Sequence, residues 1–174
     1  MTNSDISGTN YDWGVYNAIY NPRTQTTDAP GTWRTLTKDE WEYLIDDRST
    51  PSGIRYAKAT VNGVPGLIIV PDNWNTSTYS LSSTNNTRVF FTVNVISSSQ
   101  WSTLENAGCA FLPAAGFRSG TSDNNVGSGG YYWSASYSGS SGAYFLVFYS
   151  GNVNPSQSYD RYFGRSVRLV RTAQ

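Results

Sequence analysis

The sequence contains no histidine, and Cys109 is the only cysteine among its 174 residues. Catalytic groups that pair serine or cysteine with histidine are therefore excluded, as is every zinc site that uses histidine. One cysteine also rules out a disulfide within the chain. Because no other catalytic motif replaces these groups, we expect a protein that is not an enzyme and that carries no cofactor.

Charge is also scarce, at 14% of residues, and twelve basic side chains balance twelve acidic ones. No run rich in lysine or arginine is present, so the sequence lacks the electrostatic footprint of a nucleic-acid-binding protein. No apolar run approaches the roughly 18 residues of a membrane-spanning helix. The first residues also lack the basic start and apolar stretch of a signal peptide. We expect neither nucleic-acid binding nor membrane insertion.

Aromatic and small polar residues are abundant instead, with 13 tyrosines, 6 tryptophans and 16 glycines. This mixture is typical of a folded, loop-rich protein with aromatic anchors, not of a disordered chain. The length suits one domain spanning residues 1–174. Within it, we expect residues 1–10 to form a flexible N-terminal lead.

Two amphipathic helices are predicted. In TLTKDEWEYLIDDR, Thr37 and Glu40 have the spacing of a capping box, and apolar residues follow at helical intervals. The second, SSSQWSTLENAG, opens on serines that can cap it, places Leu104 on its apolar side and stops at Gly108, a natural residue to follow a helix.

Apolar runs rich in β-branched and aromatic residues predict strands, and they lie mostly in the second half of the chain. They are residues 66–70, 88–95, 109–118, 131–136, 143–150 and 166–171. Long polar connections at 72–87, 119–130 and 151–165 are predicted to be loops of functional length. Helices early and strands late favour the α+β class.

Few residues suggest chemistry. Paired acids occur at 39–40 and 46–47, on or at the ends of the first predicted helix, and acids at its N-terminal end would stabilise its dipole. Asp123 and Asp160 lie in predicted loops, and whether they meet in space stays open. Cys109 begins an apolar run, which is typical of a buried free thiol and not of a nucleophile.

Two polar segments, at 71–75 and 121–130, offer aspartate and asparagine oxygens that could bind calcium. Both fall short of an EF-hand pattern, and such clusters are more typical of turns. We predict no metal site, and whether a calcium ion is bound structurally stays open.

The C-terminal third, residues 131–165, is dominated by tyrosine, serine, glycine and asparagine. Antibody paratopes use the same residues, because tyrosine offers large amphipathic contact area and the small polar residues adapt their hydrogen bonds. The alternative is a set of turns with tyrosines filling sheet surfaces. The strand at 143–150 is apolar on both faces, so it is either buried on both sides or exposes an aromatic platform.

Six ordered motifs between residues 11 and 171 together resemble the bacterial and phage domain of the major-paralogous type, which includes the variable proteins of diversity-generating retroelements. The motifs are DWGVYNAI (12–19), WRTLTKDEWEYL (33–44), YAKATVNGVPGLIIVPDNW (56–74), WSTLENAGCAFLPAAGFR (101–118), GYYWSAS (130–136) and GRSVRLV (164–170). The resemblance implies an α+β, C-type lectin-like fold, in which two helices flank small antiparallel sheets joined by long irregular loops.

In retroelement-diversified members of that family, adenine-directed mutagenesis alters chosen codons near the C-terminus. The resemblance implies such a variable, ligand-binding region at residues 131–171. By position, its expected ligand-binding residues are Tyr137, Ser138, Ser140, Ser141, Phe145, Val147, Tyr149, Ser158, Tyr159, Asp160, Tyr162 and Phe163. Arg165, where such sequences more often have an aromatic residue, is a further expected contact. On the strand, Tyr144, Leu146 and Phe148 would then hold the core.

The resemblance therefore implies a receptor- or adhesin-type binding protein, located on a phage tail or fibre tip or on a bacterial cell surface. The expected partner is a protein or another cell-surface macromolecule. A carbohydrate-binding surface lectin is the alternative, with Trp133, Tyr137 and Tyr149 stacking on sugar rings. The calcium-dependent sugar motifs of animal lectins are absent, and one cysteine does not supply the pattern of the related formylglycine-generating enzymes.

Overall fold

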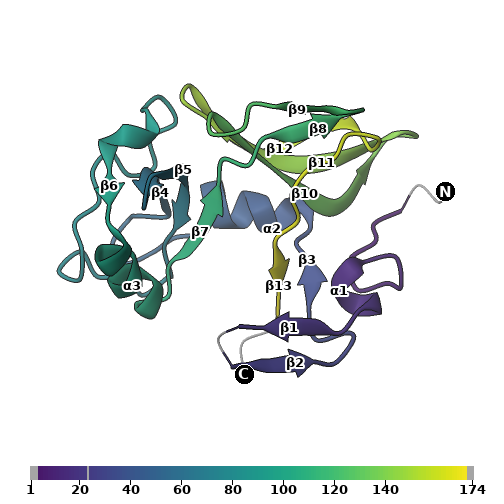
Figure 1. Cartoon of the computed structure of the whole chain (residues 1–174), viewed down its shortest axis with the longest axis horizontal. Helices are drawn as coiled ribbons and strands as arrows, with labels where there is room; N and C mark the ends of the chain where they lie inside the picture. The colour runs from purple at the N-terminus through teal and green to yellow at the C-terminus, as the bar shows by residue number, and fades with distance from the viewer. Residues whose placement is uncertain (1–3, 23, 172–174) are drawn as a thin grey trace.

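Strands predominate in the computed structural model, which describes residues 4–22 and 24–171 (Figure 1). The strands are β1 (Ile19–Asn21), β2 (Thr26–Asp28), β3 (Arg34–Thr35), β4 (Tyr56–Val61), β5 (Val64–Ile69), β6 (Val95–Ile96), β7 (Ala110–Pro113), β8 (Phe117–Ser119), β9 (Ser122–Asn124), β10 (Gly129–Ser138), β11 (Gly142–Tyr149), β12 (Asn152–Asp160) and β13 (Leu169–Val170). The helices are α1 (Trp13–Tyr16), α2 (Lys38–Glu42) and α3 (Ser98–Asn106).

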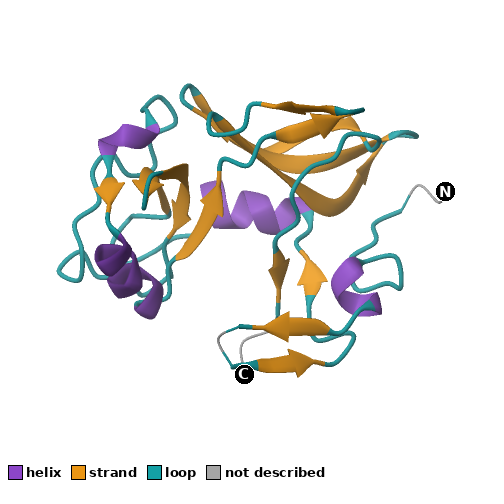
Figure 2. Ribbon diagram, viewed as in Figure 1, coloured by secondary structure: helices purple, strands orange, loops and turns teal. Residues whose placement is uncertain are grey.

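The predicted α+β class, with two helices flanking small antiparallel sheets as in a C-type lectin-like domain, is wrong for this structure. Within the described residues, three α-helices accompany thirteen strands, and the strands form several small sheets (Figure 2). The helices are short, and segments predicted to be loops pair as strands instead. No helix of the described ranges has both the length and the apolarity to cross a membrane.

Two sheets carry most of the packing. One has the strand order β6–β4–β5–β7, and α3 covers it; the other has the order β10–β11–β12 (Figure 1). Helix α2 lies between them and packs on the second sheet. The pairs β1–β2, β3–β13 and β8–β9 complete the chain, and β13 returns the C-terminal segment to the region of α1.

Local sequence signals correctly predicted where both amphipathic helices begin. Thr37 caps α2 and Ser97 caps α3, each within a full capping box. The α2 helix continues as a π-helical turn over Tyr43–Asp47, and α3 ends just before Gly108, whose φ of 96° is the left-handed conformation that glycine adopts easily.

The apolar cores form where these elements meet. Trp41 and Ile45 of the α2 segment pack against Leu146 and Phe148 of β11, and all four side chains are almost completely buried. On the first sheet, Leu104 of α3 belongs to a second cluster formed with residues of β4 and β5. The prediction that Leu146 and Phe148 hold the core is confirmed.

The predictions of a strand at 88–95 and of a loop at 151–165 are wrong. Residues 91–93 form a 3-10 helix and only 95–96 form a strand, because the Asn94 side chain binds Ser82 and Lys58 backbone groups in place of a sheet ladder. Residues 152–160 are strand β12. The polar composition of this segment indicated a loop, but β12 is an edge strand with a bulge, where even Pro155 is tolerated.

A fully buried lysine connects the two main sheets. Lys58 lies on β4, has no exposed surface, and donates from Nζ to the backbone oxygens of Thr87 at 2.7 Å and Val89 at 3.2 Å. Its third bond goes to the oxygen of Tyr149, at the end of β11. Burial lowers the pKa of Lys58 to about 8, and the three carbonyl oxygens match the three donors of an ammonium group.

Arg48 is a second buried cation whose nitrogens all have partners. Nε donates to the oxygen of Leu44 at 3.0 Å, and Nη2 donates to those of Arg55 and Val70 at 2.7 Å. Nη1 pairs with Asp72 at 2.7 Å. The guanidinium therefore fastens the end of the α2 segment to the strands beside it.

Replacing Lys58 by methionine should destabilise the fold, because it leaves three carbonyl groups without their donor in a buried site. We expect Lys58→Met to lower the free energy of unfolding by about 2–4 kcal/mol, measured by urea denaturation. Lys38→Met is the matched control. Lys38 lies at the surface in an ion pair with Glu42, and its loss should destabilise the fold far less than the loss of Lys58. Equal effects of the two variants would contradict the role given to Lys58.

Candidate functional site

Two stretches that are distant in the sequence meet at one end of the sheet β10–β11–β12. Gly142, which begins β11, lies opposite Asp160 at the end of β12, and Ser141 Oγ donates to the Asp160 carboxylate at 2.8 Å. We call this end of the sheet the tip surface. Its exposed and half-buried members are Tyr137, Ser138, Ser140, Ser141, Ser158, Tyr159, Asp160 and Tyr162.

Arg161 holds the two halves of the tip surface together. Its Nη2 donates to the backbone oxygen of Ser140 at 2.7 Å, and its Nε donates to that of Ser141 at 3.2 Å. The Arg161 backbone N–H also donates to the Ser141 oxygen at 3.0 Å. Because Arg161 binds backbone oxygens, these three bonds do not depend on which side chains occupy positions 140 and 141.

Serine side chains supply hydrogen bonds where the pairing of β10 and β11 is interrupted, close to the tip surface. The ladder between β10 and β11 breaks between Trp133 and Tyr137, where the register shifts. Ser134 Oγ donates to the oxygen of Tyr144 at 2.9 Å and accepts from the N–H of Ser136 at 3.1 Å. These bonds satisfy backbone groups that the bulge takes out of the ladder.

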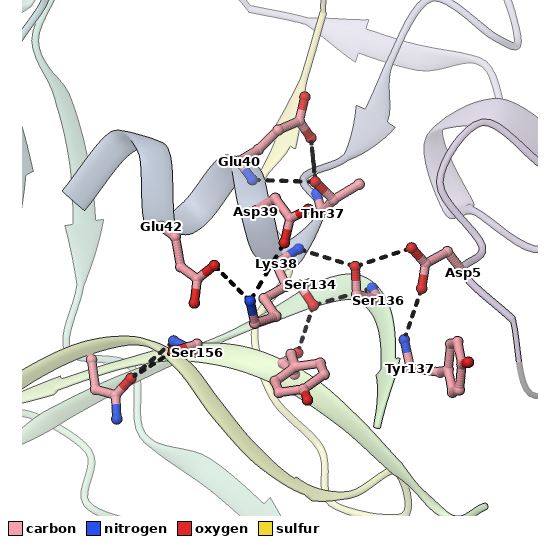
Figure 3. Close-up of polar contacts among 12 residues, drawn as sticks. Asp5, Thr37, Lys38, Asp39, Glu40, Glu42, Ser134, Ser136, Tyr137 and Ser156 are labelled. Carbon is pink, nitrogen blue, oxygen red and sulfur yellow. Dashed lines mark hydrogen bonds and ion pairs between the residues drawn. The ribbon is translucent and has the colours of Figure 1, made fainter. Parts of the chain in front are cut away.

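The same part of β10 is tied to α2 and to the N-terminal segment (Figure 3). Ser136 Oγ accepts from the backbone N–H of Lys38 at 3.1 Å and donates to the Asp5 carboxylate at 3.3 Å. Asp5 also accepts from the backbone N–H of Tyr137 at 3.2 Å. Asp5 belongs to the lead expected at residues 1–10, of which 1–3 lie outside the described residues. The base of the tip surface is therefore held by a framework of polar bonds.

The predicted ligand-binding residues at the tip do not share one face of the sheet. Tyr137 lies opposite Ala143, and Ala143 lies opposite Tyr159, so the two tyrosines flank a small residue on the outer face. Ser158 lies opposite Tyr144 on the other face, toward α2. The tip surface therefore wraps around the end of the sheet.

Phe145 and Val147, predicted to vary on an exposed face, are buried, with exposed fractions of 3% and 4%. Strand β11 is thus covered on both faces, which resolves the alternative left open by its sequence. Neither side chain can present contact area to a ligand in this structure. The prediction that both residues contact a ligand is therefore wrong.

The cover over Phe145 comes from the end of the predicted strand 109–118 and from the segment 151–165, which was predicted to be a loop. Strands β8 and β9 form a hairpin, and Phe117 of β8 packs edge-on against Tyr131 and Phe163, with ring centroids 4.9 and 5.8 Å away. Backbone bonds between Arg118 and Gly164 join that hairpin to the segment after β12. Phe163, an expected contact, is therefore half-buried and serves mainly as cover.

Tyr149 is exposed but lies far from the tip surface. It stands at the other end of β11, six residues from Ala143, a span of about 20 Å along an extended strand. There it lines a cavity of about 330 Å³ with Tyr131, Asn125 and Ser128. The structure does not bring Tyr149 together with the other expected ligand-binding residues.

The guanidinium of Arg165 lies in a ring of aromatic side chains on the outer face. Its central carbon is 3.9 Å from the ring centroid of Phe145 and 4.3 Å from that of Trp133. Further rings lie at 5.4 to 5.9 Å, those of Phe163, Tyr159 and Phe117. Nε and Nη1 are buried without a hydrogen-bond partner. Burial lowers the pKa of Arg165 to about 10.

Cys109 and the loop acids show no arrangement for catalysis or metal binding. The thiol is buried, as predicted, and burial raises its pKa to about 12, so the thiolate is disfavoured at neutral pH. Asp123 lies 3.8 Å from Arg118, and Asp160 accepts from Ser141. In the described part of the chain, no three acidic or cysteine side chains gather as metal ligands would.

Sequence reasoning missed the β8–β9 hairpin, although a signal for it is present. Ser119 pairs with Ser122, which leaves Gly120 and Thr121 as a two-residue turn. Gly120 has a φ of 57°, and glycine at the first central position is typical of hairpin turns of the II′ type. Most of β8 fell within the predicted strand 109–118, but the residues of β9 are too polar to indicate a strand by their periodicity, so the turn was the only cue to the hairpin.

The burial of Phe145 can be tested on the strand itself. Phe145→Ala should lower the free energy of unfolding by about 3–5 kcal/mol, because it opens a cavity beneath Arg165. Tyr149→Ala, an equally drastic truncation at an exposed position of the same strand face, should cost about 1 kcal/mol or less. Both values come from urea denaturation followed by circular dichroism. Similar losses for the two variants would contradict the covered face.

The comparisons with known proteins bear on the family alone. No curated protein and no solved structure matches the chain. A family model described as a domain of unknown function, DUF8237, matches residues 69–170. That range includes more than half of the 174 residues, with the tip surface, the β8–β9 hairpin and the ring around Arg165 all inside it. The chain therefore belongs to the DUF8237 family.

Proposed function

We propose that this protein is a non-enzymatic ligand-binding protein whose C-terminal third forms the binding surface, as in the retroelement-diversified proteins that its sequence resembles. One observation carries the proposal. Residues 137–141 and 158–162, which are separate in the sequence, converge at the end of one sheet and expose tyrosines there. Such convergence builds one contact area from two segments.

The composition of the tip surface supports binding. Tyr137, Tyr159 and Tyr162 are 41%, 54% and 75% exposed. Tyrosine buries much area at low entropic cost, and the serines around it supply adaptable hydrogen bonds. Exposing several large aromatic side chains together is unfavourable in water unless a partner covers them.

The framework beneath the tip surface is compatible with variation at its positions. The bonds that hold this end of the sheet come from strand ladders, from the Arg161 side chain and from Ser134, Ser136 and Asp5. Most exposed tip side chains take no part in them, apart from the bond between Ser141 and Asp160. Substitutions at the tip should therefore change the contact surface and leave the fold intact.

The proposed partner is a protein or other macromolecule on a cell surface, and the proposed location is a phage tail or fibre tip or a bacterial surface. Tyrosines at the end of a sheet suit broad contact areas, in which a few aromatic residues dominate the binding energy. A glycan is the second candidate, favoured by the cavity of about 330 Å³ that Tyr149 lines with polar residues. Trp133 does not favour it, because Arg165 stacks on its ring.

Truncating the exposed tyrosines should weaken binding and leave the fold intact. We expect Tyr159→Ala and Tyr162→Ala each to reduce affinity for bacterial cells that bind the wild type by about 1–3 kcal/mol, measured with fluorescently labelled protein. Melting temperatures should stay nearly unchanged. Tyr16→Ala is the matched control, since Tyr16 is 71% exposed on α1, outside the tip surface.

The proposal fails if the Tyr162 variant unfolds, or if Tyr16→Ala weakens binding as much as the two tip variants. A glycan ligand gives a different pattern. Binding would then survive protease treatment of the cells and would be lost on Tyr149→Ala.

The DNA beside the gene tests the retroelement origin separately. We expect a near-copy of the segment that encodes residues 131–171, differing from it mainly at adenines, with a reverse transcriptase gene nearby. Substitutions templated by that copy should fall on tip positions such as Tyr137 and Tyr159, and should spare the codons of the buried Leu146 and Phe148. Finding neither the copy nor the reverse transcriptase would remove the diversification part of the proposal.

A further inference from the structure

We propose that Arg165 and the aromatic side chains that encircle its guanidinium form a subsite for a carboxylate group of the protein ligand; this rests on the proposed function. Comparison with two fully buried cations of the chain shows what is unusual about Arg165, which is half-buried. Lys58 and Arg48 each donate to several backbone oxygens, and Arg48 also pairs with Asp72. For Arg165, two guanidinium nitrogens are buried without any acceptor.

The charge of Arg165 is also uncompensated. The ion pairs between described residues involve the arginines at 34, 48, 118 and 171 and Lys38, but not Arg165. The rings of Phe145 and Trp133 hold the guanidinium by cation–π contact, but they accept no hydrogen bond of ordinary strength. An unpaired charge among apolar side chains attracts an anion more strongly than the same charge in water.

The approach to Arg165 is open on one side. Nε and Nη1 are buried, whereas Nη2 is not among the buried unpartnered atoms and is therefore the nitrogen that a ligand can reach. Arg165 lines a cavity of about 410 Å³ together with Phe117, Arg118 and Gly164. Arg118 is largely exposed on this cavity and adds a second positive charge to it.

The geometry favours a carboxylate over a larger anion. The Phe145 and Trp133 rings stand nearly perpendicular to each other, 5.5 Å apart, beside the guanidinium. A small planar carboxylate needs less room next to them than a tetrahedral phosphate. Asp123 also lines the cavity, 3.8 Å from Arg118. Its charge would repel a phosphate dianion more strongly than a singly charged carboxylate.

The subsite adjoins the tip surface through Tyr159. This side chain is 54% exposed at the tip, and its ring centroid is 5.8 Å from the Arg165 guanidinium carbon. A protein that packs on Tyr159 can therefore place an aspartate or glutamate side chain at Arg165. The aromatic side chains around Arg165 are already in place without a ligand, so binding requires little loss of side-chain freedom.

The test uses N-acetylglutamate as the probe and follows the arginine Nε–H resonances of the full chain by NMR. We expect a saturable shift of the Arg165 resonance, with half-saturation in the range of about 1–30 mM, as for a single charge-assisted contact. N-acetylglutamine methylamide, which carries no carboxylate, and sodium chloride at equal ionic strength should give no saturable shift. Inorganic phosphate should bind at least several-fold more weakly.

Variants assign the effect to Arg165. In Arg165→Met, tyrosine resonances at the tip should lose their response to N-acetylglutamate, and the melting temperature should be equal or higher, because an apolar side chain suits the ring. Arg88→Met removes the same charge from an exposed position outside this cavity and should keep the full response.

The carboxylate subsite is refuted if N-acetylglutamate gives no saturable shift, if N-acetylglutamine methylamide gives the same shift, or if phosphate binds as tightly. Such a result leaves the proposed function standing when Tyr162→Ala still weakens binding to cells. Conversely, if N-acetylglutamate binds but the tyrosine truncations have no effect on cell binding, the proposed function fails and Arg165 is an anion site of another purpose.

Discussion

The buried ammonium of Lys58 is the interaction on which the arrangement of the two main sheets depends. It extends from β4, in the first sheet, to the backbone oxygen of Tyr149, where β11 of the second sheet ends. It also binds the segment at 87–89 that passes between them. A buried charge is stable only where its donors are satisfied, so these carbonyls must converge on Lys58 whenever the domain is folded. The orientation of β11, and with it the tip surface at its far end, follows from that convergence.

In the second sheet, the position of a residue along β11 determines whether its side chain is buried or exposed. Phe145 to Phe148, in the middle, are buried on both faces, under α2 on one side and under the β8–β9 hairpin and Arg165 on the other. Beyond Ala143 the cover ends, and the side chains of the tip surface reach solvent. The rigid part and the exposed part thus belong to the same strands, which allows the surface to change without a cost to the core.

Local signals in the sequence predicted the features that depend on neighbouring residues. The caps at Thr37 and Ser97 and the stop at Gly108 are of this kind. The tip segments were also expected to contact a ligand, but that expectation came from the resemblance to retroelement-diversified proteins and not from local signals. Pairing between distant segments could not be predicted. Nothing near Phe145 indicates that Arg165 and Phe163 return to cover it. That contact depends on the β8–β9 hairpin, in which Phe117 is the one large apolar residue and β9 is polar.

Arg165, which is half-buried, differs from the buried cations Lys58 and Arg48 in what it contributes to folding. Every donor of Lys58 and each guanidinium nitrogen of Arg48 has an acceptor, so their desolvation is offset within the folded chain. The two buried nitrogens of Arg165 have none, and each such group costs about 1–3 kcal/mol. Cation–π contacts offset part of this, by about 2 kcal/mol or more for a desolvated cation. An apolar side chain would fill the space between the same aromatic side chains without burying unpaired donors. Arg165 therefore differs from Lys58 and Arg48 in that its surroundings leave a nitrogen, Nη2, for an acceptor from outside the chain, which is the position that the proposed carboxylate would take.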